Sequence, residues 1–308
     1  MKDFLSIIQC STDELLDLLR LARELKALYK KGGRDLCLAG KTLAMLFEKA
    51  SLRTRLSFQV AMIDLGGYAL NLKPDDIGII GKREPAKDMA RVLSRYVHGI
   101  MARTFAHDTI VEFAHYATVP VINALSDWSH PCQAMADVMT IEEHLGKLNG
   151  IKIAYIGDGN NVARSLAFVA AKLSMQLVLA SPEGYDLDAD SIQLANDTQA
   201  GCVQTTRDPF VAVKGADVIY TDTWISMGQE AEKEQRIRQF QGFQVNRELL
   251  DAAPKHSRVM HCLPAYRGME ITDDAVECPQ SIIFDEAENR LHFQRALLKK
   301  LLSGSMPH

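Results

Sequence analysis

The chain has 308 residues, a length that suits two domains of ordinary size better than one. Hydrophobic residues make up 47% and charged residues 24%, which excludes disordered and fibrous proteins. The formal net charge is −4 at pH 7, and Lys and Arg are scattered along the chain. No basic stripe is available to neutralise a nucleic-acid backbone, so we expect no nucleic-acid partner.

The N-terminal segment and the cysteines indicate the compartment. Residues 1–10 lack the long apolar run and cleavage site of a secretory signal. No apolar stretch reaches the roughly 20 residues that a membrane helix needs, so we expect no membrane association. The six cysteines are widely spaced without a C-x-x-C pair, which favours reduced thiols over disulfides or a zinc site. We therefore predict a cytoplasmic protein without a bound metal.

The first predicted element is a helix that follows Ser11-Thr-Asp-Glu14, a capping-box pattern. After it, short apolar runs alternate with longer segments of helical period, and the runs are residues 43–47, 99–102, 119–122, 151–156, 177–180, 218–221 and 258–260. This alternation predicts an α/β fold in which parallel sheets carry helices on both faces. Ligands of such sheets bind at the carboxyl ends of the strands.

The boundary between the two predicted domains falls in a polar, glycine-punctuated stretch, residues 146–150. We expect a first domain over residues 1–147 and a second over residues 148–286. The segment 287–302 has helical period and is expected to close the fold.

The motif Ser51-Leu-Arg-Thr-Arg55 follows the apolar run 43–47 and opens a helical pattern. A helix N-terminus offers unpaired N–H groups and a positive dipole end, so added hydroxyl and guanidinium groups make a phosphate site. Residues two apart on a helix point in nearly opposite directions. We therefore expect Arg53 to bind the phosphate with Ser51 and Thr54, and Arg55 to be structural. The alternative is a capped surface helix that happens to be basic.

The second motif is His130-Pro-Cys-Gln133, which precedes a helical stretch. Proline at the first helical position leaves His130 and Gln133 near the same end of the helix. A histidine N–H that donates to a carbonyl oxygen and an amide that accepts from an NH2 group suit a carbamoyl group. The alternative is a histidine that caps the helix or packs in the core.

The third pair of motifs is Asp222-Thr-Trp-Ile-Ser-Met-Gly228 and His261-Cys-Leu-Pro264, each directly after an apolar run. An aspartate at a strand end can bind a cationic α-amine, while Ser226 and backbone groups can hold a carboxylate. The alternatives are an ordinary strand-to-loop corner and, for Cys262, a buried inert thiol.

Gly157-Asp-Gly-Asn-Asn-Val162 resembles the dinucleotide fingerprint of a dehydrogenase but does not complete it. Val162 stands where the third glycine belongs, and the next apolar run ends in Ser181-Pro182 where an acidic ribose ligand would be needed. A dinucleotide-dependent dehydrogenase is therefore the disfavoured alternative, and Asn160 and Asn161 offer amide groups at this turn.

The ordered set of these motifs, together with Glu288-Asn-Arg290, resembles the ornithine carbamoyltransferase family over nearly the whole chain. The resemblance implies transfer of the carbamoyl group of carbamoyl phosphate to the δ-amine of L-ornithine, which gives L-citrulline and phosphate without metal, organic cofactor or covalent intermediate. It implies carbamoyl phosphate ligands at Ser51, Leu52, Arg53, Thr54, Arg103, His130, Gln133, Cys262, Leu263 and Arg290. Ornithine ligands are implied at Asn161, Asp222, Ser226 and Met227, and catalytic roles at Arg103, His130, Asp222 and Cys262.

The resemblance also implies two α/β domains with terminal helices that cross between them, so that residues 287–308 pack back toward the first domain, and a homotrimer or a multiple of trimers. In the family, a Gln or His two residues before Gly81 enters the neighbouring subunit's site. Here that position is Ile79, and Lys82 and Arg83 are the candidates to replace it.

Carbamoyltransferases with other second substrates are the alternatives to this activity. Aspartate carbamoyltransferase shares the phosphate and H-P-x-Q motifs but lacks D-x-x-x-S-M-G, which this chain has at residues 222–228. Carbamoyltransferases for N-acylornithine or putrescine stay open as alternatives.

Overall fold

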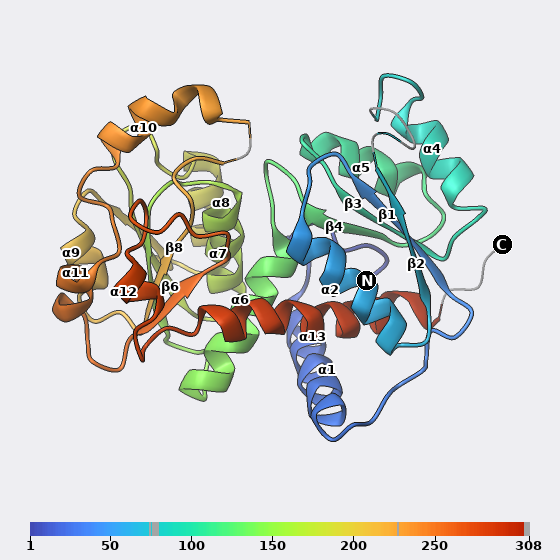
Figure 1. Ribbon diagram of the computed structural model, residues 1–308, viewed down its shortest axis with the longest axis horizontal. Helices are drawn as coiled ribbons and strands as arrows, with labels where there is room; N and C mark the ends of the chain where they lie inside the picture. Colours follow the sequence, from blue (N-terminus) through green and yellow to red (C-terminus); the bar gives the residue numbers. More distant parts are fainter. Residues whose placement is uncertain (74, 76–79, 227, 305–308) are drawn as a thin grey trace. The chain divides into compact units, whose positions relative to one another are not determined.

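The computed structural model describes residues 1–73, 75, 80–226 and 228–304. The chain divides into two compact units. Unit 1 comprises Met1–Met139 and the segment from Glu288 onward, and unit 2 comprises Thr140–Ala287. Each unit holds a parallel sheet flanked by helices (Figure 1), which confirms the predicted α/β fold. The division at Met139 falls inside a helix, before the glycine-punctuated stretch in which we placed the domain boundary, and the boundaries of the functional domains stay a prediction.

Unit 1 contains a four-stranded sheet in the order β2-β1-β3-β4. Its strands are β1 (Thr42–Phe47), β2 (Tyr68–Leu72), β3 (Gly99–Arg103) and β4 (Val121–Leu125). The chain passes from β1 to β2 on one side and then returns to β3 on the other, so the strand order reverses between β1 and β3. Phe47 pairs with Arg103 at the carboxyl ends of these two strands. Ligands of open parallel sheets bind at such a reversal, so the loops after β1 and β3 are the expected site in unit 1.

The helices of unit 1 are α1 (Thr12–Lys30), α2 (Leu52–Asp64), α4 (Ala86–Leu93), α5 (His107–Tyr116), the first part of α6 (Pro131–Leu145) and most of α13 (Ile283–Leu302). The predicted capping box of α1 is confirmed, because Ser11 and Glu14 each accept the other's backbone N–H. Buried residues of α4 and α5, including Met89 and Phe113, form one core with Leu46 of β1. On α13, Leu302 lies so close to Gly99 of β3 that a Cβ atom there would come within 2.6 Å of it.

Unit 2 contains a five-stranded parallel sheet in the order β7-β6-β5-β8-β9. Its strands are β5 (Lys152–Ile156), β6 (Gln176–Ala180), β7 (Val203–Thr206), β8 (Val218–Thr221) and β9 (Arg258–His261). The order reverses between β5 and β8, where Ile156 pairs with Thr221, which in turn pairs with His261. The residues that leave these strand ends carry the remaining motifs.

The helices of unit 2 are the rest of α6, α7 (Asn161–Lys172), α8 (Ala189–Thr198), α9 (Pro209–Val213), α10 (Lys233–Gln239), α11 (Arg247–Ala252) and α12 (Asp273–Val276), with the short 3-10 helix η1 (Glu230–Glu232). Residues of α9, α11 and α12 form a core with β5, β6, β8 and β9. Helix α7 is buried along most of its length. Among the residues that the structure describes, every helix is too short or too polar to cross a membrane.

Candidate active site

In unit 1, the start of α2 lies directly after β1, at the reversal of the strand order. Ser51 is the N-cap: its backbone is extended, and its Oγ accepts from the backbone N–H of Thr54 at 3.3 Å. The hydroxyl proton of Ser51 is then available to donate to an anion. Leu52 is the first helical residue and is 64% exposed, Arg53 is half-buried and Thr54 is buried. The site therefore combines N–H groups, two hydroxyls and a guanidinium at a helix N-terminus, as a phosphate requires.

Arg290 on α13 reaches the same place from the far end of the sequence. It is buried, and its Nη2 donates to the Thr54 hydroxyl at 2.8 Å. The adjacent Asn289 accepts from Lys26 of α1 at 2.7 Å, which fixes this turn of α13 within unit 1. Arg290 thereby adds a buried positive charge next to the half-buried Arg53 at the α2 N-terminus.

Arg103 and His130 complete this cluster. Arg103 ends β3, is mostly buried, and its carbonyl accepts from the backbone N–H of Glu48 in the loop after β1. Burial lowers the pKa of His130 well below its ordinary value, and the positive charges of Arg290 and Arg103 lower it further. His130 is therefore neutral at pH 7 and keeps one N–H to donate. Unit 1 thus brings together Thr54, Arg103, His130 and Arg290, as the sequence predicted.

The loop that carries His130 is fixed by hydrogen bonds from β4. The amide of Asn123 donates to the carbonyl of Ser129 at 3.4 Å and to that of Leu5 at 2.9 Å. The backbone N–H of Ser126 donates to the same Ser129 carbonyl at 2.9 Å. Pro131 then begins α6, as predicted, so the orientation of His130 is set by the residues on either side of it.

Gln133 lies in the first turn of α6 and is buried. Its NH2 group donates to the Asp137 carboxylate, one turn further along the helix, at 2.8 Å. This contact sets the direction of the amide, so the oxygen of Gln133 is presented on its other side as the acceptor. An acceptor is what the NH2 of a carbamoyl group needs.

In unit 2, Asp222 follows β8 and is buried. Its carboxylate accepts from the amide of Asn160 at 2.8 Å, from the thiol of Cys262 at 3.0 Å and from the backbone N–H of Thr223 at 2.8 Å. A carboxylate has about four acceptor positions, so Asp222 can accept from a further amine. Cys262 is half-buried and donates to Asp222, so its thiol is not fully buried as our alternative required.

Asn160 and Asn161 were both expected to offer their amide groups to a ligand. Asn160 instead has a structural role. Its side-chain oxygen caps α7 by accepting from the backbone N–H groups of Val162 and Ala163, and its NH2 group donates to Asp222. Asn161 is the first residue of α7 and is half-buried. The sequence could not separate the two roles, because both residues are asparagines at the same turn.

The glycine turn that resembled a dinucleotide fingerprint has a different physical cause. A Cβ atom on Gly159 would come within 2.1 Å of the backbone nitrogen of Leu187. The backbone N–H of Gly159 also donates to the carbonyl of Tyr185 at 2.8 Å. The glycine is therefore needed for close packing of two backbone segments within unit 2.

The His261-Cys-Leu-Pro264 segment is held by a buried histidine. Nδ1 of His261 accepts from the backbone N–H of Leu263 at 2.8 Å, so the proton is on Nε2, which lies 3.1 Å from the Glu270 carboxylate. The backbone N–H of His261 donates to the Glu286 carboxylate at 2.9 Å. Leu263 adopts a left-handed conformation with φ of 56°. These contacts fix the backbone on which Cys262 and Leu263 lie.

Asp222, His261 and Cys262 offer ligand atoms within 4.8 Å of one another, close enough to hold a metal ion. Each group already has a hydrogen-bonding role, because Cys262 donates to Asp222 and both ring nitrogens of His261 are engaged.

The remaining predicted ligands lie in loops. Ser226 is half-buried, and its backbone N–H donates to the side-chain oxygen of Gln229 at 2.9 Å. Met227 and Ile79 lie outside the described residues. Lys82 and Arg83 are exposed in the turn before α4.

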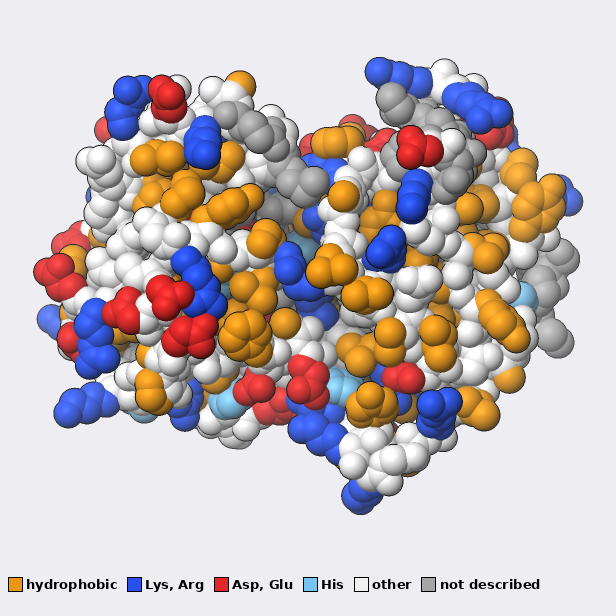
Figure 2. All heavy atoms as spheres, viewed as in Figure 1, with side chains coloured by type: hydrophobic (Ala, Val, Ile, Leu, Met, Phe, Trp, Pro, Cys, Tyr) orange, Lys and Arg blue, Asp and Glu red, His pale blue; other side chains and the backbone are white. Residues whose placement is uncertain are grey.

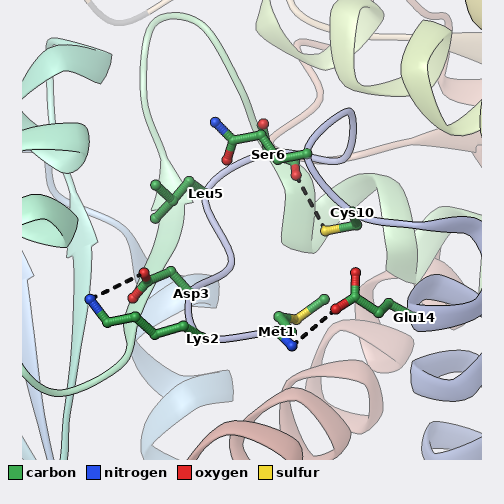
Figure 3. Close-up of a pocket in the computed structure, with 8 residues that line it drawn as sticks. Met1, Lys2, Asp3, Leu5, Ser6, Cys10 and Glu14 are labelled. Carbon is green, nitrogen blue, oxygen red and sulfur yellow. Dashed lines mark hydrogen bonds and ion pairs between the residues drawn. The ribbon is translucent and has the colours of Figure 1, made fainter.

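A separate pocket of about 260 Å³ lies in unit 1 beside the N-terminal segment (Figure 3). The residues that line it are Met1, Lys2, Asp3, Leu5, Ser6, Gln9, Cys10 and Glu14. None of the predicted site residues is among them, so this pocket does not belong to the candidate active site.

Two family models match the chain, one over its N-terminal half and the other over its C-terminal half. The carbamoyl-P binding domain of aspartate/ornithine carbamoyltransferase matches residues 2–143, and the Asp/Orn binding domain matches residues 149–301. The chain therefore belongs to the aspartate/ornithine carbamoyltransferase family.

Several individual proteins similar to this chain are named as ornithine carbamoyltransferases. The chain is 51% identical to the ornithine carbamoyltransferase of Methanocorpusculum labreanum over 98% of both chains. It is 52% identical to that of Anoxybacillus flavithermus, over 98% of this chain and 96% of the relative. The solved ornithine carbamoyltransferase of Pyrococcus furiosus shares 49% identity and aligns with a TM-score of 0.96, over 99% of this chain and 98% of that chain.

Proposed function

We propose that this protein is an ornithine carbamoyltransferase, which transfers the carbamoyl group of carbamoyl phosphate to the δ-amine of L-ornithine. The observation that carries the proposal is the buried cluster of unit 1, in which a neutral His130 lies in the field of Arg103 and Arg290 beside the N-terminus of α2. A dianionic phosphate fits the positive charges, and a neutral carbonyl fits the histidine N–H. The family membership and the names of the relatives support the same reaction.

In the proposed mechanism, the phosphate of carbamoyl phosphate binds at the N-terminus of α2. It is held by Ser51, Arg53, Thr54 and the first N–H groups of the helix, from Leu52 onward. Arg103 and His130 donate to the carbonyl oxygen, while the oxygen of Gln133 and the backbone of Leu263 accept from the carbamoyl NH2. When the amine attacks, negative charge develops on the carbonyl oxygen, and these preorganised donors stabilise it. The new C–N bond forms, the C–O bond to phosphate breaks, and the nitrogen gives one proton to the departing phosphate.

The attacking amine must be neutral to expose its lone pair, although an amine of this type has a pKa of about 10.4 in water. We assign Asp222 and Cys262 to hold this amine, because both lie at the carboxyl ends of adjacent strands and already contact each other. Asn161, Ser226 and Met227 are assigned to the α-amino and carboxylate groups of ornithine. Catalysis then rests on positioning and charge stabilisation.

A single assay tests the reaction. Purified protein is given carbamoyl phosphate with L-ornithine, N-acetylornithine, putrescine or L-aspartate in parallel, and each carbamoylated product and phosphate are measured. Citrulline formation with ornithine at a kcat/KM at least about a hundredfold above the others supports the proposal, because a site built for two ionic groups discriminates strongly against an analogue that lacks one. Faster turnover of any other amine would contradict the assignment to ornithine.

We further propose that the enzyme is a homotrimer, or a multiple of trimers, in the cytoplasm. Helix α2 exposes Leu52, Leu56 and Ile63 on one side, and the edge strand β2 exposes Tyr68 and Leu70 on one face. Ile63 is 58% and Tyr68 67% exposed, and Figure 2 shows hydrophobic side chains over this part of unit 1. An exposed edge strand with apolar residues favours contact with another chain, and a head-to-tail contact that closes gives a ring. All six cysteines are present as thiols, which supports the cytoplasm.

The assembly has its own test. Ile63→Lys is expected to lower the molar mass in light scattering from a multiple of three chains toward one chain. The matched control is Leu194→Lys, which charges an exposed leucine of α8 in unit 2. If Ile63→Lys keeps the wild-type mass, this surface is not the interface. Substituting Lys82 and Arg83 separately by Ala then shows which of them reaches a neighbouring site, through loss of kcat without loss of assembly.

A further inference from the structure

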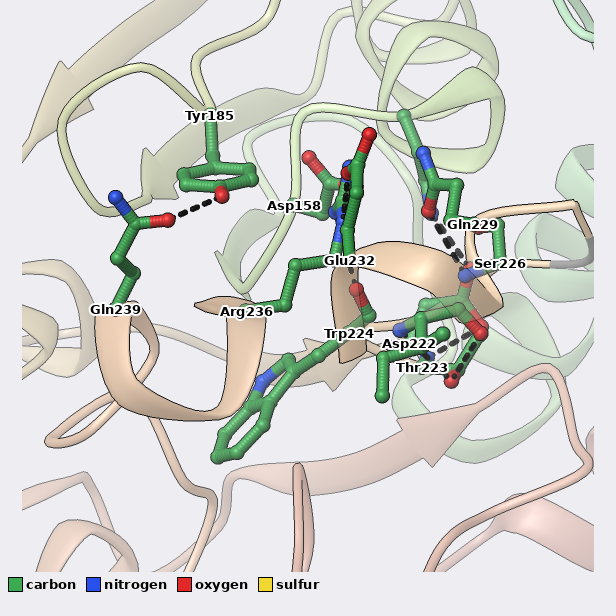
Figure 4. Close-up of polar contacts among 12 residues, drawn as sticks. Asp158, Tyr185, Asp222, Thr223, Trp224, Ser226, Gln229, Glu232, Arg236 and Gln239 are labelled. Carbon is green, nitrogen blue, oxygen red and sulfur yellow. Dashed lines mark hydrogen bonds and ion pairs between the residues drawn. The ribbon is translucent and has the colours of Figure 1, made fainter. Parts of the chain in front are cut away.

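Arg236 on α10 joins three separate segments of unit 2 although it is only 6% exposed. Its Nη1 donates to the Asp158 carboxylate at 2.9 Å and to the carbonyl of Trp224 at 3.1 Å, and its Nε donates to Glu232 at 2.9 Å (Figure 4). The ring of Tyr185 lies 4.8 Å from the guanidinium carbon. One side chain therefore ties the turn after β5 and the loop after β8 to α10.

The same two segments carry the proposed ornithine site. Asp158 belongs to the turn that leads to Asn161, and the carbonyl of Trp224 lies between Asp222 and Ser226 in the sequence. We refer to residues 222–226 as the 222–226 loop. Asn160 and Asp222 form a second link between these segments, at 2.8 Å. Arg236 thus fixes the middle of the 222–226 loop, whereas Asn160 fixes its beginning.

Aromatic packing forms a second connection between α10, which carries Arg236, and the 222–226 loop. The ring of Trp224 stacks on Phe240, with centroids 5.5 Å apart and an interplanar angle of 29°. Phe240 directly follows α10 and also contacts Tyr185, whose hydroxyl donates to Gln239. The backbone of Trp224 is therefore held by Arg236, and its side chain is held by the end of the same helix.

A buried ion pair is a weak device for stability, because removing two charges from water offsets much of their attraction. Burial raises the pKa of Asp158 in spite of the adjacent guanidinium, which shows how strongly desolvation acts here. Apolar side chains of similar volume would often stabilise such a place equally well. Apolar side chains could not, however, donate a hydrogen bond to the carbonyl of Trp224, as Arg236 does.

We infer that Arg236 is a positioning residue that holds the 222–226 loop in the shape that accepts the second substrate, an inference that rests on the proposed function. A loop that is already ordered does not have to become ordered when ornithine binds. Loss of this preorganisation therefore weakens the binding of ornithine. The phosphate of carbamoyl phosphate is assigned to residues of unit 1, and Leu263, which is assigned to its NH2 group, lies outside the 222–226 loop. Binding of carbamoyl phosphate is therefore expected to be independent of Arg236.

The variants are Arg236→Gln, Asp158→Asn and the double substitution, with Arg236→Lys as the conservative change. Arg247→Gln is the matched control, since Arg247 pairs with Asp251 on α11 of the same unit, outside the 222–226 loop. For each variant we measure kcat, both KM values and the dissociation constant of L-norvaline, which is ornithine without its side-chain amine. Thermal unfolding identifies variants that do not fold.

For Arg236→Gln we expect an ornithine KM raised at least about tenfold and a norvaline dissociation constant raised in parallel, with the carbamoyl phosphate KM within about twofold of wild type. The ornithine KM of the double variant should be no higher than that of Arg236→Gln, because both substitutions remove the same interaction, the ion pair between Arg236 and Asp158. Arg236→Lys keeps the charge but not the fork of donors, so its ornithine KM should lie in between. Arg247→Gln should match the wild type.

The two failures are distinguishable. If the wild-type protein forms no citrulline, the proposed function is wrong whatever Arg236 does. If the wild type forms citrulline but Arg236→Gln keeps its ornithine KM, or if both KM values rise equally, the positioning role is wrong. Should Arg236→Gln fail to fold, Arg236→Lys and Asp158→Asn decide by the same criterion.

Discussion

The hydroxyl of Thr54 accepts a hydrogen bond of 2.8 Å from the guanidinium of Arg290, although 236 residues separate them in the chain. Both side chains are buried. A hydroxyl that accepts from a guanidinium must direct its own proton elsewhere, because the guanidinium has no acceptor. Arg290 therefore orients Thr54 as a donor toward the N-terminus of α2, where the phosphate is proposed to bind.

Thr54→Val tests this orientation. Valine keeps the shape but removes the donor to phosphate and the acceptor for Arg290, so we expect the carbamoyl phosphate KM to rise about tenfold or more. Thr54→Ser keeps the hydroxyl and serves as the control, with a KM near wild type. Steady-state kinetics at saturating ornithine measure both, and equal KM values for the two variants would show that the hydroxyl has no role.

Arg53→Ala should leave a folded protein that binds carbamoyl phosphate about ten- to a hundredfold more weakly, because a charge-assisted hydrogen bond to a dianion is lost. Arg55→Ala is the matched control, since Arg55 is on the same helix turn and equally half-buried. Calorimetric titration with carbamoyl phosphate compares them. A larger loss in Arg55→Ala would reverse our assignment of the two arginines.

The lowered pKa of His130 predicts how stability depends on pH. An unfolded histidine titrates at a pKa of about 6.5, so below that pH the unfolded chain binds a proton that the folded protein does not, and the free energy of unfolding falls. Between about pH 7.5 and pH 5.5, the wild type should lose about 1.4 kcal/mol more than His130→Gln. Urea unfolding at both pH values measures this, and parallel losses would mean that His130 titrates normally in the folded protein.

Cys262→Ala removes one donor to Asp222 without removing the carboxylate. We expect citrulline formation to continue with an ornithine KM raised about three- to tenfold, the size of one hydrogen bond. Cys262→Ser keeps a donor and should fall between the alanine variant and wild type. Mass spectrometry of the protein during turnover checks for a carbamoylated thiol, whose detection would replace the direct attack by ornithine with a covalent route.

The pH dependence of kcat/KM for ornithine should follow the amine of the substrate. Arginine and hydroxyl groups do not titrate near neutrality, and His130 is already neutral there, so activity should rise with pH as ornithine loses its proton. His130→Gln still donates from an amide and should keep this rise. Loss of the rising limb in His130→Gln, with normal norvaline binding, would identify His130 as the general base.

The strands made mostly of buried residues could be predicted from the sequence, and the two strands with several exposed positions could not. The apolar runs found β1, β3, β5, β6, β8 and β9, and β4 begins two residues later than its run. We missed β2 and β7, which are the first strands in the order of their sheets. Both have exposed positions, as in Val203-Gln-Thr-Thr206, whereas the strands at the opposite edges, β4 and β9, are mostly buried. A run of buried apolar residues is therefore not required of them.

In the site, the residues inside local motifs could be predicted, and their supporting partners could not. Ser51 caps α2 and Pro131 begins α6 as the local spacing indicated. Glu270, which contacts His261, and Arg236, which contacts Asp158, lie in stretches that resemble ordinary surface sequence. The contact of Arg236 with Asp158 spans 78 residues, and no local pattern encodes a partner at that distance.

The division of the chain into units also affects when each unit can be completed during synthesis. Unit 2 is continuous from Thr140 to Ala287, whereas unit 1 also needs the segment from Glu288 onward. Domains generally fold as units during synthesis. Unit 1 therefore cannot be completed before the last segment of the chain is made, and Thr54 gains its contact with Arg290 only then. A polypeptide that ended at residue 287 would contain all the described strands of both sheets but would lack Arg290, which is assigned to the proposed phosphate site.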